Sequence, residues 1–331
     1  MRVLGIETSC DETAAAVVGE GLRLHSNVIA SQAALHRRFG GVVPELASRK
    51  HIERLLPVVD EALEQAGMDL GRIDGLAVTR GPGLVGALTV GVAAAKAIAL
   101  ARGLPFVGVN HLEGHIYAAF LAEPDIAFPV LALIVSGAHA DLVVMRDHGR
   151  YEILGRSRDD AAGEAFDKVA RAMGLGYPGG PEIDRLGRDG RAEAAPLPLP
   201  MADETWDFSF SGVKTAALRA LYAHPGDPAF RRDLAASLQR VVVEVLIRKT
   251  MRAAQLTRPA TVVVTGGVAA NSRLRGEMAE ACRARGLRLV IPPPILCTDN
   301  AAMIAAAGLY RLSAGERSSL DLSAESDLSL H

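Results

Sequence analysis

The sequence has few cysteines: Cys10, Cys282 and Cys297 are the three among 331 residues. Three is an odd number and no two of them form a C-x-x-C pair, so we exclude a disulfide framework and a zinc ribbon and expect reduced thiols. A secretory signal is also missing. The start, MRVLGIETSCDET, carries acidic residues where such a signal has its apolar core. We therefore expect a cytoplasmic protein.

Long apolar runs and an excess of charge are missing as well. The most apolar stretch, residues 84–101, is rich in alanine and glycine and carries Lys96, so we predict a buried helix and no transmembrane segment. The net charge is −2, so contact with nucleic acid would depend on local basic clusters such as Arg37-Arg38 and Arg231-Arg232. With 49% hydrophobic and 22% charged residues, the composition is that of a soluble globular protein long enough for two domains.

A pattern of strand, polar turn and strand occurs twice. Apolar runs at 2–6 and 14–18 flank the turn ETSCDET, and runs at 130–135 and 142–145 flank SGAHAD. This repetition predicts two related lobes, each beginning with a hairpin whose tip faces a cleft between them. We place the lobes at 1–129 and 130–312, and the Ser- and Asp-rich residues 313–331 are predicted to be a flexible tail.

The remaining segments predict an α/β architecture in both lobes. Segments with helical periodicity either end at a glycine or begin after a glycine turn, and we expect these to be helices. Short runs of β-branched residues are expected to be strands. Helices are expected within 51–67, 84–102, 159–176, 177–187, 268–286 and 300–312, and strands within 74–80, 261–265 and 287–291. The Pro-rich residues 192–216 are expected to form an extended loop.

Two histidines in NHLEGHIYA, His111 and His115, lie one helical turn apart if a helix begins at Asn110. Both imidazoles would then point to the same side and could bind a metal, although the spacing alone is also found in pairs of surface histidines. A zinc protease motif needs glutamate directly after the first histidine, where Leu112 stands. Asp299, between a predicted strand and a predicted helix, is a candidate third ligand.

Two further features indicate nucleotide binding. The turn Gly266-Gly267, between a strand and a helix, allows a ligand to approach the backbone, although such turns also serve packing alone. The two hairpin tips offer amides and hydroxyls to phosphate oxygens. The combination resembles the actin, Hsp70 and sugar-kinase superfamily, so we expect that two-lobed α/β fold.

A closer resemblance rests on motifs that follow in order: GIETSCDET, GGVVPELASRKH, VTRGPGLVGALTVG, NHLEGH, DDAAGEAFDKVARAMGLGYPGGP, FSFSGVKTA, GGVAAN and CTDNAAMIA. The sequence is similar to the TsaD/Gcp family from Met1 to about Leu312. The resemblance implies transfer of threonylcarbamoyl from threonylcarbamoyl-AMP to the N6 amine of the adenosine 3′-adjacent to the anticodon, in tRNAs reading ANN codons. The old peptidase name of the family is not supported by these residues.

The resemblance also implies roles for individual residues. Its metal ligands match His111, His115 and Asp299, which would hold one divalent ion per chain, usually assigned as Fe²⁺, with Zn²⁺ or Mg²⁺ as alternatives. Asp11, on the first hairpin tip, is the candidate for accepting the amine proton or orienting the adenosine, and the alternative role for it is a turn cap. The positions that line the nucleotide and threonylcarbamoyl pocket match Ile134, Val135, Ser136, Gly137, Ala138, Asp167, Gly180, Asp184 and Asn271.

The sequence departs from the family at two positions of the second tip. Ala138 and Ala140 stand where the family usually has glycine and threonine. The methyl group of Ala138 would tighten the pocket if the backbone there took a positive φ.

The family also suggests partners: tRNA, a TsaB-like paralogue, a TsaE-like ATPase, and TsaC as the source of threonylcarbamoyl-AMP, with no membrane. The other functions considered are a kinase or ATPase of the same superfamily and a non-catalytic tRNA-binding scaffold, neither of which would need the metal ligands.

Overall fold

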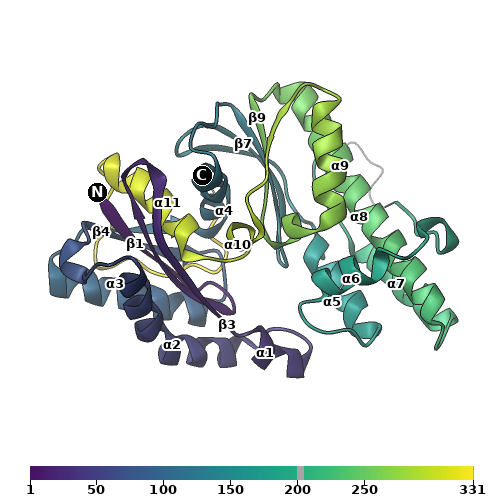
Figure 1. Cartoon of the computed structure of the whole chain (residues 1–331), viewed down its shortest axis with the longest axis horizontal. Coiled ribbons are helices and arrows are strands. Elements are labelled where there is room, and N and C mark those ends of the chain that lie inside the picture. The colour runs from purple at the N-terminus through teal and green to yellow at the C-terminus, as the bar shows by residue number, and fades with distance from the viewer. Residues whose placement is uncertain (200–204, 331) are drawn as a thin grey trace. The chain divides into compact units, whose positions relative to one another are not determined.

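The computed structural model describes residues 1–199 and 205–330 (Figure 1). The chain forms two compact units, one of Met1–Ile126 with Ile295–His331 and one of Ala127–Pro294. This division differs from the predicted lobes at the C-terminal end, because the segment after residue 294 belongs to the first unit. The physical reason is helix α11 (Ala301–Ser313), which packs against strand β1 (Arg2–Glu7).

The first unit contains a five-stranded sheet in the order β3-β2-β1-β4-β5. β1, β2 and β3 are antiparallel neighbours, whereas β4 and β5 run parallel to β1. Its elements are β1, β2 (Glu12–Gly19), β3 (Arg23–Ser31), α1 (Ala33–His36), α2 (Pro44–Gln65), β4 (Gly75–Gly81), α3 (Val85–Arg102), β5 (Phe106–Asn110), α4 (His111–Ala122), α10 (Pro294–Cys297, which begins at the boundary) and α11.

Helices cover both faces of this sheet. Leu4 and Ile6 of β1 lie in a core with Leu55 of α2 and Val92 of α3. Gly5 lies between them and faces the other side, where a Cβ atom would collide with the backbone of α11. The first unit is therefore a three-layer α/β/α structure with α2 and α3 on one face and α11, joined by α4, on the other.

The Ser- and Asp-rich C-terminal segment follows the first unit closely through residue 330. The Ser318 amide donates to the Phe106 carbonyl oxygen at 2.8 Å, and Leu330 is 3% exposed. Leu322 packs against the core. The flexible tail predicted for residues 313–331 is therefore not seen through residue 330. The physical reason is that the segment forms hydrogen bonds along the open edge of β5.

The second unit repeats the strand arrangement of the first. Its sheet has the order β10-β9-β6-β7-β8, so its first three strands are again antiparallel neighbours and the last two lie parallel to the first. Its elements are β6 (Val130–Val135), β7 (Ala140–Asp147), β8 (Arg150–Gly155), α5 (Ala162–Ala172), α6 (Gly179–Gly187), α7 (Ser211–Ala223), α8 (Pro228–Thr257), β9 (Thr261–Thr265), α9 (Ser272–Arg283) and β10 (Arg288–Val290).

Both predicted hairpins are confirmed, and so are the strands β4 and β9. The sequence patterns missed β3, β5, β8 and the long helix α8. The loop predicted over 192–216 is wrong at its end, because α7 begins at Ser211; residues 200–204 of that loop lie outside the described residues.

Helix α3 is the one described helix that is long and apolar enough to cross a membrane, judged by length and composition. A single such helix is weak evidence for a span, since a core helix passes the same test. Only 33% of this helix is buried, so the prediction of a buried helix holds for one of its faces. That face packs on β4 and α2. The other face exposes Val85 and Leu100.

Candidate functional site

Both histidines of the NHLEGHIYA motif lie in the first turns of α4, as predicted. Asn110 caps this helix: its side-chain oxygen accepts from the amides of Leu112 at 2.9 Å and Glu113 at 3.4 Å. His111 and His115 are 6% and 0% exposed, so they are not surface histidines. Their rings lie 4.7 Å apart between centroids.

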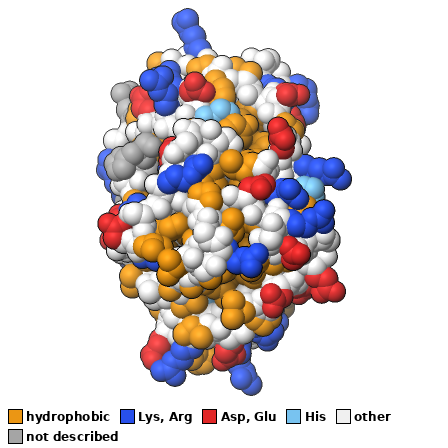
Figure 2. Space-filling model, turned by 90° about the vertical axis from the view of Figure 1, so that its left-hand side faces the viewer, with side chains coloured by type: hydrophobic (Ala, Val, Ile, Leu, Met, Phe, Trp, Pro, Cys, Tyr) orange, Lys and Arg blue, Asp and Glu red, His pale blue; other side chains and the backbone are white. Residues whose placement is uncertain are grey.

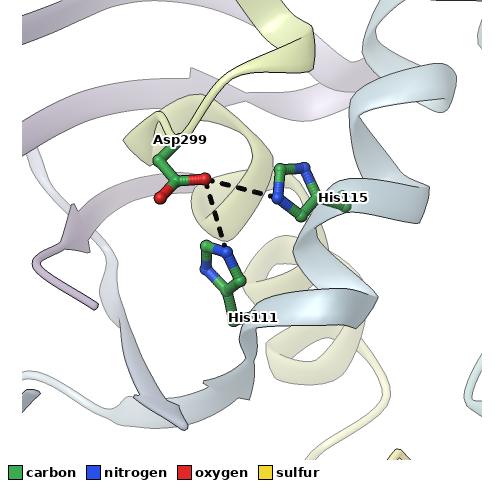
Figure 3. A group of neighbouring side chains, drawn as sticks. All are labelled: His111, His115 and Asp299. Carbon is green, nitrogen blue, oxygen red and sulfur yellow. Dashed lines mark ion pairs between the residues drawn. The ribbon is translucent and has the colours of Figure 1, made fainter. Parts of the chain in front are cut away.

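Asp299 approaches both rings from the loop before α11 (Figure 3). Its Oδ1 atom lies 3.4 Å from the Nε2 atom of His111 and 3.4 Å from that of His115. One potential ligand atom from each residue falls within 4.8 Å of the others. The fold thus brings together all three predicted metal ligands, which the sequence spacing could not do.

A fourth residue, Glu7 at the end of β1, orients His111. Its Oε2 atom lies 3.0 Å from the Nδ1 atom of His111 and accepts from the Thr79 hydroxyl at 2.7 Å, and its other oxygen accepts from the Ser9 amide. A carboxylate only accepts, so Nδ1 is the donor and Nε2 faces Asp299. A carboxylate that accepts from the far nitrogen of a histidine in this way fixes the orientation of the ring and leaves the other nitrogen for a metal.

The electrostatics of this cluster are those of a cation site. Burial alone would lower the pKa of His111, but the carboxylates of Asp299 and Glu7 outweigh it and raise that pKa well above the ordinary 6.5. Burial would raise the pKa of Asp299, but the two imidazoles outweigh it and lower the pKa far below its ordinary value. The carboxylates of Asp299 and Glu7 therefore favour a positive charge at this place, whether from a proton or from a metal ion.

The chemistry of these donors fits a divalent transition metal. Two imidazole nitrogens and one carboxylate oxygen suit Fe²⁺ or Zn²⁺, whereas Mg²⁺ prefers oxygen ligands alone. Three protein ligands also leave coordination positions for a substrate. The residues His111, His115 and Asp299 could therefore hold one ion per chain.

Asp11 lies on the first hairpin tip and is 6% exposed. It shares a hydrogen bond with Glu12, and burial together with the charges of Asp11 and Asp299 raises the pKa of Glu12 to about 9. Burial also raises the pKa of Cys10 well above its ordinary value, so this thiol is not an activated nucleophile. The structure thus places Asp11 in an acidic group near Asp299.

In the second unit, the predicted substrate residues gather where β6 and β9 end. These strands are parallel neighbours, with Ile134 opposite Thr265, so the segments that follow them meet at one edge of the sheet. Gly266 has φ +91°, and a Cβ atom there would overlap the Val135 carbonyl group. The Gly-Gly turn is therefore held against the start of the second hairpin tip, so Gly266 also has a packing role.

The hairpin tip itself is exposed at Gly137 and Ala138, whereas the side chains of Ile134 and Val135 are fully buried. Those two residues can therefore offer a ligand only their backbone. The Ser136 hydroxyl accepts from the Ala138 amide at 3.3 Å. Among described residues other than glycine, positive φ is confined to Leu22 and Arg258, so the methyl group of Ala138 causes no backbone strain.

Asp167 contacts Gly179, the neighbour of Gly180, at the start of α6. The Oδ1 atom of Asp167, on α5, accepts from the Gly179 amide at 2.6 Å. A Cβ atom at Gly180 would have no neighbour within 4 Å, so a ligand could approach its backbone. Asp167 thus caps α6 with one oxygen.

Asp184 and Asn271 meet at the start of α9. The Ser272 hydroxyl donates to Asp184 at 2.7 Å, and the Asn271 side chain donates to Gln239 at 2.8 Å while its oxygen accepts from the Leu274 amide. Asp184, Gln239 and Ser272 line a polar cavity of about 300 Å³. The predicted pocket residues thus lie within one unit, with Asp167 and Asp184 inside α5 and α6 and the others at the ends of elements.

Sequence reasoning missed Glu7, Ser9 and Thr79 around His111, and Gln239 beside Asn271. A signal for Glu7 existed, because it ends a strand parallel to the one that precedes His111, and the carboxyl ends of parallel strands share one edge of a sheet. No such signal existed for Gln239, which lies within α8.

Solved structures of low sequence identity share the fold. Component A of the (R)-2-hydroxyglutaryl-CoA dehydratase of Acidaminococcus fermentans matches with a TM-score of 0.59 and 15% identity, over 95% of this chain and 99% of that chain. The ROK hexokinase of Thermus thermophilus matches with a TM-score of 0.53 and 19% identity, over 95% and 100%. The predicted fold of the actin, Hsp70 and sugar-kinase superfamily is confirmed.

Sequence relatives show the family. A protein of Symbiobacterium thermophilum named tRNA N6-adenosine threonylcarbamoyltransferase is 58% identical over 329 residues, or 99% of this chain and 96% of that protein. One of the same name from Desulfitobacterium hafniense is 55% identical over 94% of this chain and 92% of its own. The family profile "TsaD: tRNA N6-adenosine threonylcarbamoyltransferase" matches residues 23–306. The chain therefore belongs to the TsaD family of tRNA-modifying transferases.

Proposed function

We propose that this chain transfers the threonylcarbamoyl group from threonylcarbamoyl-AMP to the N6 amine of the adenosine 3′-adjacent to the anticodon, in tRNAs that read ANN codons. Family membership supports tRNA N6-adenosine threonylcarbamoylation. The observation that carries the rest of the proposal is the convergence of His111, His115 and Asp299 on one point. A superfamily kinase or ATPase, or a non-catalytic tRNA-binding scaffold, would have no use for that cluster.

The reaction is an acyl transfer. The lone pair of the adenosine N6 attacks the carbamoyl carbon, the bond from that carbon to the phosphate oxygen breaks, and AMP leaves with the electron pair. One proton must leave N6. We assign its acceptance, or the alignment of the adenosine, to Asp11, which lies in the acidic group near Asp299.

We assign metal binding to His111, His115 and Asp299, with Glu7 holding the first ring in place. The ion, for which we propose Fe²⁺ with Zn²⁺ as the alternative, would polarise the carbonyl group as a Lewis acid. Asp299 brings one negative charge to two neutral ligands. The Glu7 carboxylate beside His111 brings a second negative charge, so the loaded site would be close to neutral.

We assign the nucleotide and threonylcarbamoyl contacts to the second unit. The exposed tip at Gly137 and Ala138 and the open position at Gly180 allow a ligand to approach the backbone. Asp167 and Asp184 accept hydrogen bonds within the protein, and each carboxylate has further lone pairs that could accept from ribose hydroxyls or an amino group. Asn271 positions the helix start beside them.

Partners remain part of the proposal: tRNA, a TsaB-like paralogue and a TsaE-like ATPase, in the cytoplasm. The exposed face of α2 and α3 offers a surface for a protein partner. It carries Ile52 and Leu56 one helical turn apart on α2, and Val85 and Leu100 on α3. Figure 2 shows the side of the molecule that lies on the left in Figure 1, where hydrophobic side chains reach the surface among charged ones.

Mass spectrometry of tRNA nucleosides tests the proposal. The chain is incubated with threonine, bicarbonate, ATP, the partner proteins and one purified tRNA at a time. We expect threonylcarbamoyladenosine in tRNAs that read ANN codons and none in the others. ATP hydrolysis without modified nucleoside would favour the kinase or ATPase alternative. Modification that needs a different chain, with this one only binding tRNA, would favour the scaffold.

A further inference from the structure

Residues 325–328 of the C-terminal segment, here called the C-terminal clasp, join two places next to His111. All of these contacts lie within the first unit. At the first place, the Glu325 amide donates to the Arg80 carbonyl oxygen at 2.8 Å, and the two side chains form an ion pair. A Cβ atom at Gly81 would overlap the Glu325 carbonyl oxygen, so the clasp and the end of β4 are in close contact.

The contact continues from the clasp to His111 through the loop after β4. The Gly83 amide donates to the Ser326 carbonyl oxygen at 3.1 Å, and the next amide, of Leu84, donates to the Ser9 carbonyl oxygen at 2.8 Å. The Ser9 hydroxyl lies 3.2 Å from the Nδ1 atom of His111. A Cβ atom at Gly83 would lie 2.6 Å from the Ser9 carbonyl oxygen, so the loop after β4 packs closely against Ser9.

The second place is the cap of α4. The Asn110 side chain uses its oxygen to cap the helix and its amide group to donate to the Leu328 carbonyl oxygen at 3.2 Å. The clasp thereby fixes the orientation of a side chain whose neighbour in sequence is His111. Helix ends fray unless something holds them, and here the first helical residue is a candidate metal ligand.

We propose that the C-terminal clasp positions His111 for metal binding, by holding the Asn110 cap on one side of the ring and the Ser9 loop on the other. This inference rests on the metal assignment above. Without the clasp, the first turn of α4 would be free to fray, and the ligand atoms of the three residues would spend less time within 4.8 Å of one another. Groups that orient metal ligands typically contribute roughly 10- to 100-fold to metal affinity.

The test is a titration of the purified full chain with Co²⁺, followed by its visible absorption, which reports the ligand geometry. Three variants loosen the clasp in different ways. A chain ending at Ala324 lacks it, Gly81→Ala pushes it away, and Asn110→Ser keeps a capping oxygen but cannot reach Leu328. Gly276→Ala, where a Cβ atom would meet nothing within 4 Å, is the matched control.

We expect each of the three variants to bind Co²⁺ roughly tenfold or more weakly than the parent chain and to change its absorption spectrum, and Gly276→Ala to do neither. Wild-type affinity and spectrum in Asn110→Ser and the shortened chain would overturn the proposal. If the shortened chain does not fold, Asn110→Ser decides, with folding checked by thermal unfolding without metal. A parent chain that binds no Co²⁺ would overturn the metal assignment itself and this inference with it.

Discussion

Changing Glu7 to glutamine removes the negative charge that orients His111 and keeps the shape of the side chain. The side chain is fully buried, and glutamine has nearly the same shape, so the change opens no cavity. The amide oxygen can still accept from Thr79 or Ser9, but the hydrogen bond to the Nδ1 atom of His111 loses its charge. The ring would then be held by a weaker contact and by the Ser9 hydroxyl.

The size of the effect follows from this contact. A hydrogen bond to a charged group contributes roughly 1.5–3 kcal/mol, against about 1 kcal/mol for a neutral one. Glu7→Gln replaces the charged hydrogen bond to His111 by a neutral one and makes the imidazole of His111 less basic. Together these changes should weaken metal binding by roughly 10- to 100-fold. The transfer rate at saturating metal should fall much less, because Glu7 is not one of the three ligands.

Metal affinity is measured by competition with a chelator, and folding by thermal unfolding. Glu113→Gln is the matched control, since Glu113 is also a fully buried acid and lies on α4 with His111, but it pairs with Arg311, 2.8 Å away. We expect Glu113→Gln to lower the melting temperature and keep the metal affinity. If Glu7→Gln binds metal as the parent chain does, or if both variants lose metal equally, Glu7 does not position the site.

Three further predictions concern other residues. Asp11→Asn should keep the fold and the metal but slow single-turnover transfer by roughly a hundredfold; a normal rate with a lowered melting temperature would make Asp11 a turn cap. Burial raises the pKa of Asp141 from 3.8 to about 6. Between these two pH values the folded chain binds more protons at Asp141 than the unfolded chain does, so the free energy of unfolding falls as the pH rises from about 4 to about 6. Asp141→Asn does not titrate, so its free energy of unfolding should rise relative to that of the parent chain by up to roughly 3 kcal/mol between pH 4 and pH 7, measured by urea unfolding. The same difference between the two chains at every pH would contradict this. Gly266→Ala should cost roughly 1–3 kcal/mol of stability in urea unfolding, whereas Gly267→Ala, which has open space, should keep the stability and weaken only AMP binding in calorimetry.

The candidate site was predictable from sequence where a motif carried it. His111 and His115 share a helical turn, and the place of Asp299 between a strand and a helix made it a candidate third ligand, although only the fold could bring it to them. Glu7 was missed because β5, the short strand with a glycine that precedes His111, was not recognised. Without that strand, the parallel order of β1, β4 and β5 could not be drawn, and Glu7 had no reason to lie near His111.

The fold was predictable where periodicity was strong. The hairpins stand out because apolar runs flank a polar turn, and they revealed the repeat of the two units. Helix α8 was missed because it is buried on several sides and so lacks a clear polar face. The division of the chain was misplaced for another reason: α11 packs on a sheet whose first strand lies near the other end of the chain, and no local pattern reports such a contact.

The central claim is that this chain itself moves the threonylcarbamoyl group, with the help of His111, His115 and Asp299. The most direct measurement is a single-turnover reaction with threonylcarbamoyl-AMP labelled at the carbamoyl carbon, a tRNA that reads an ANN codon, the partner proteins and metal-loaded chain. The account predicts that the label appears on N6 of the adenosine 3′-adjacent to the anticodon as AMP is released, and that His115→Ala, folded but without metal, transfers at least roughly a hundredfold more slowly. Label released as free product with none on the tRNA, or equal transfer by His115→Ala, would contradict it.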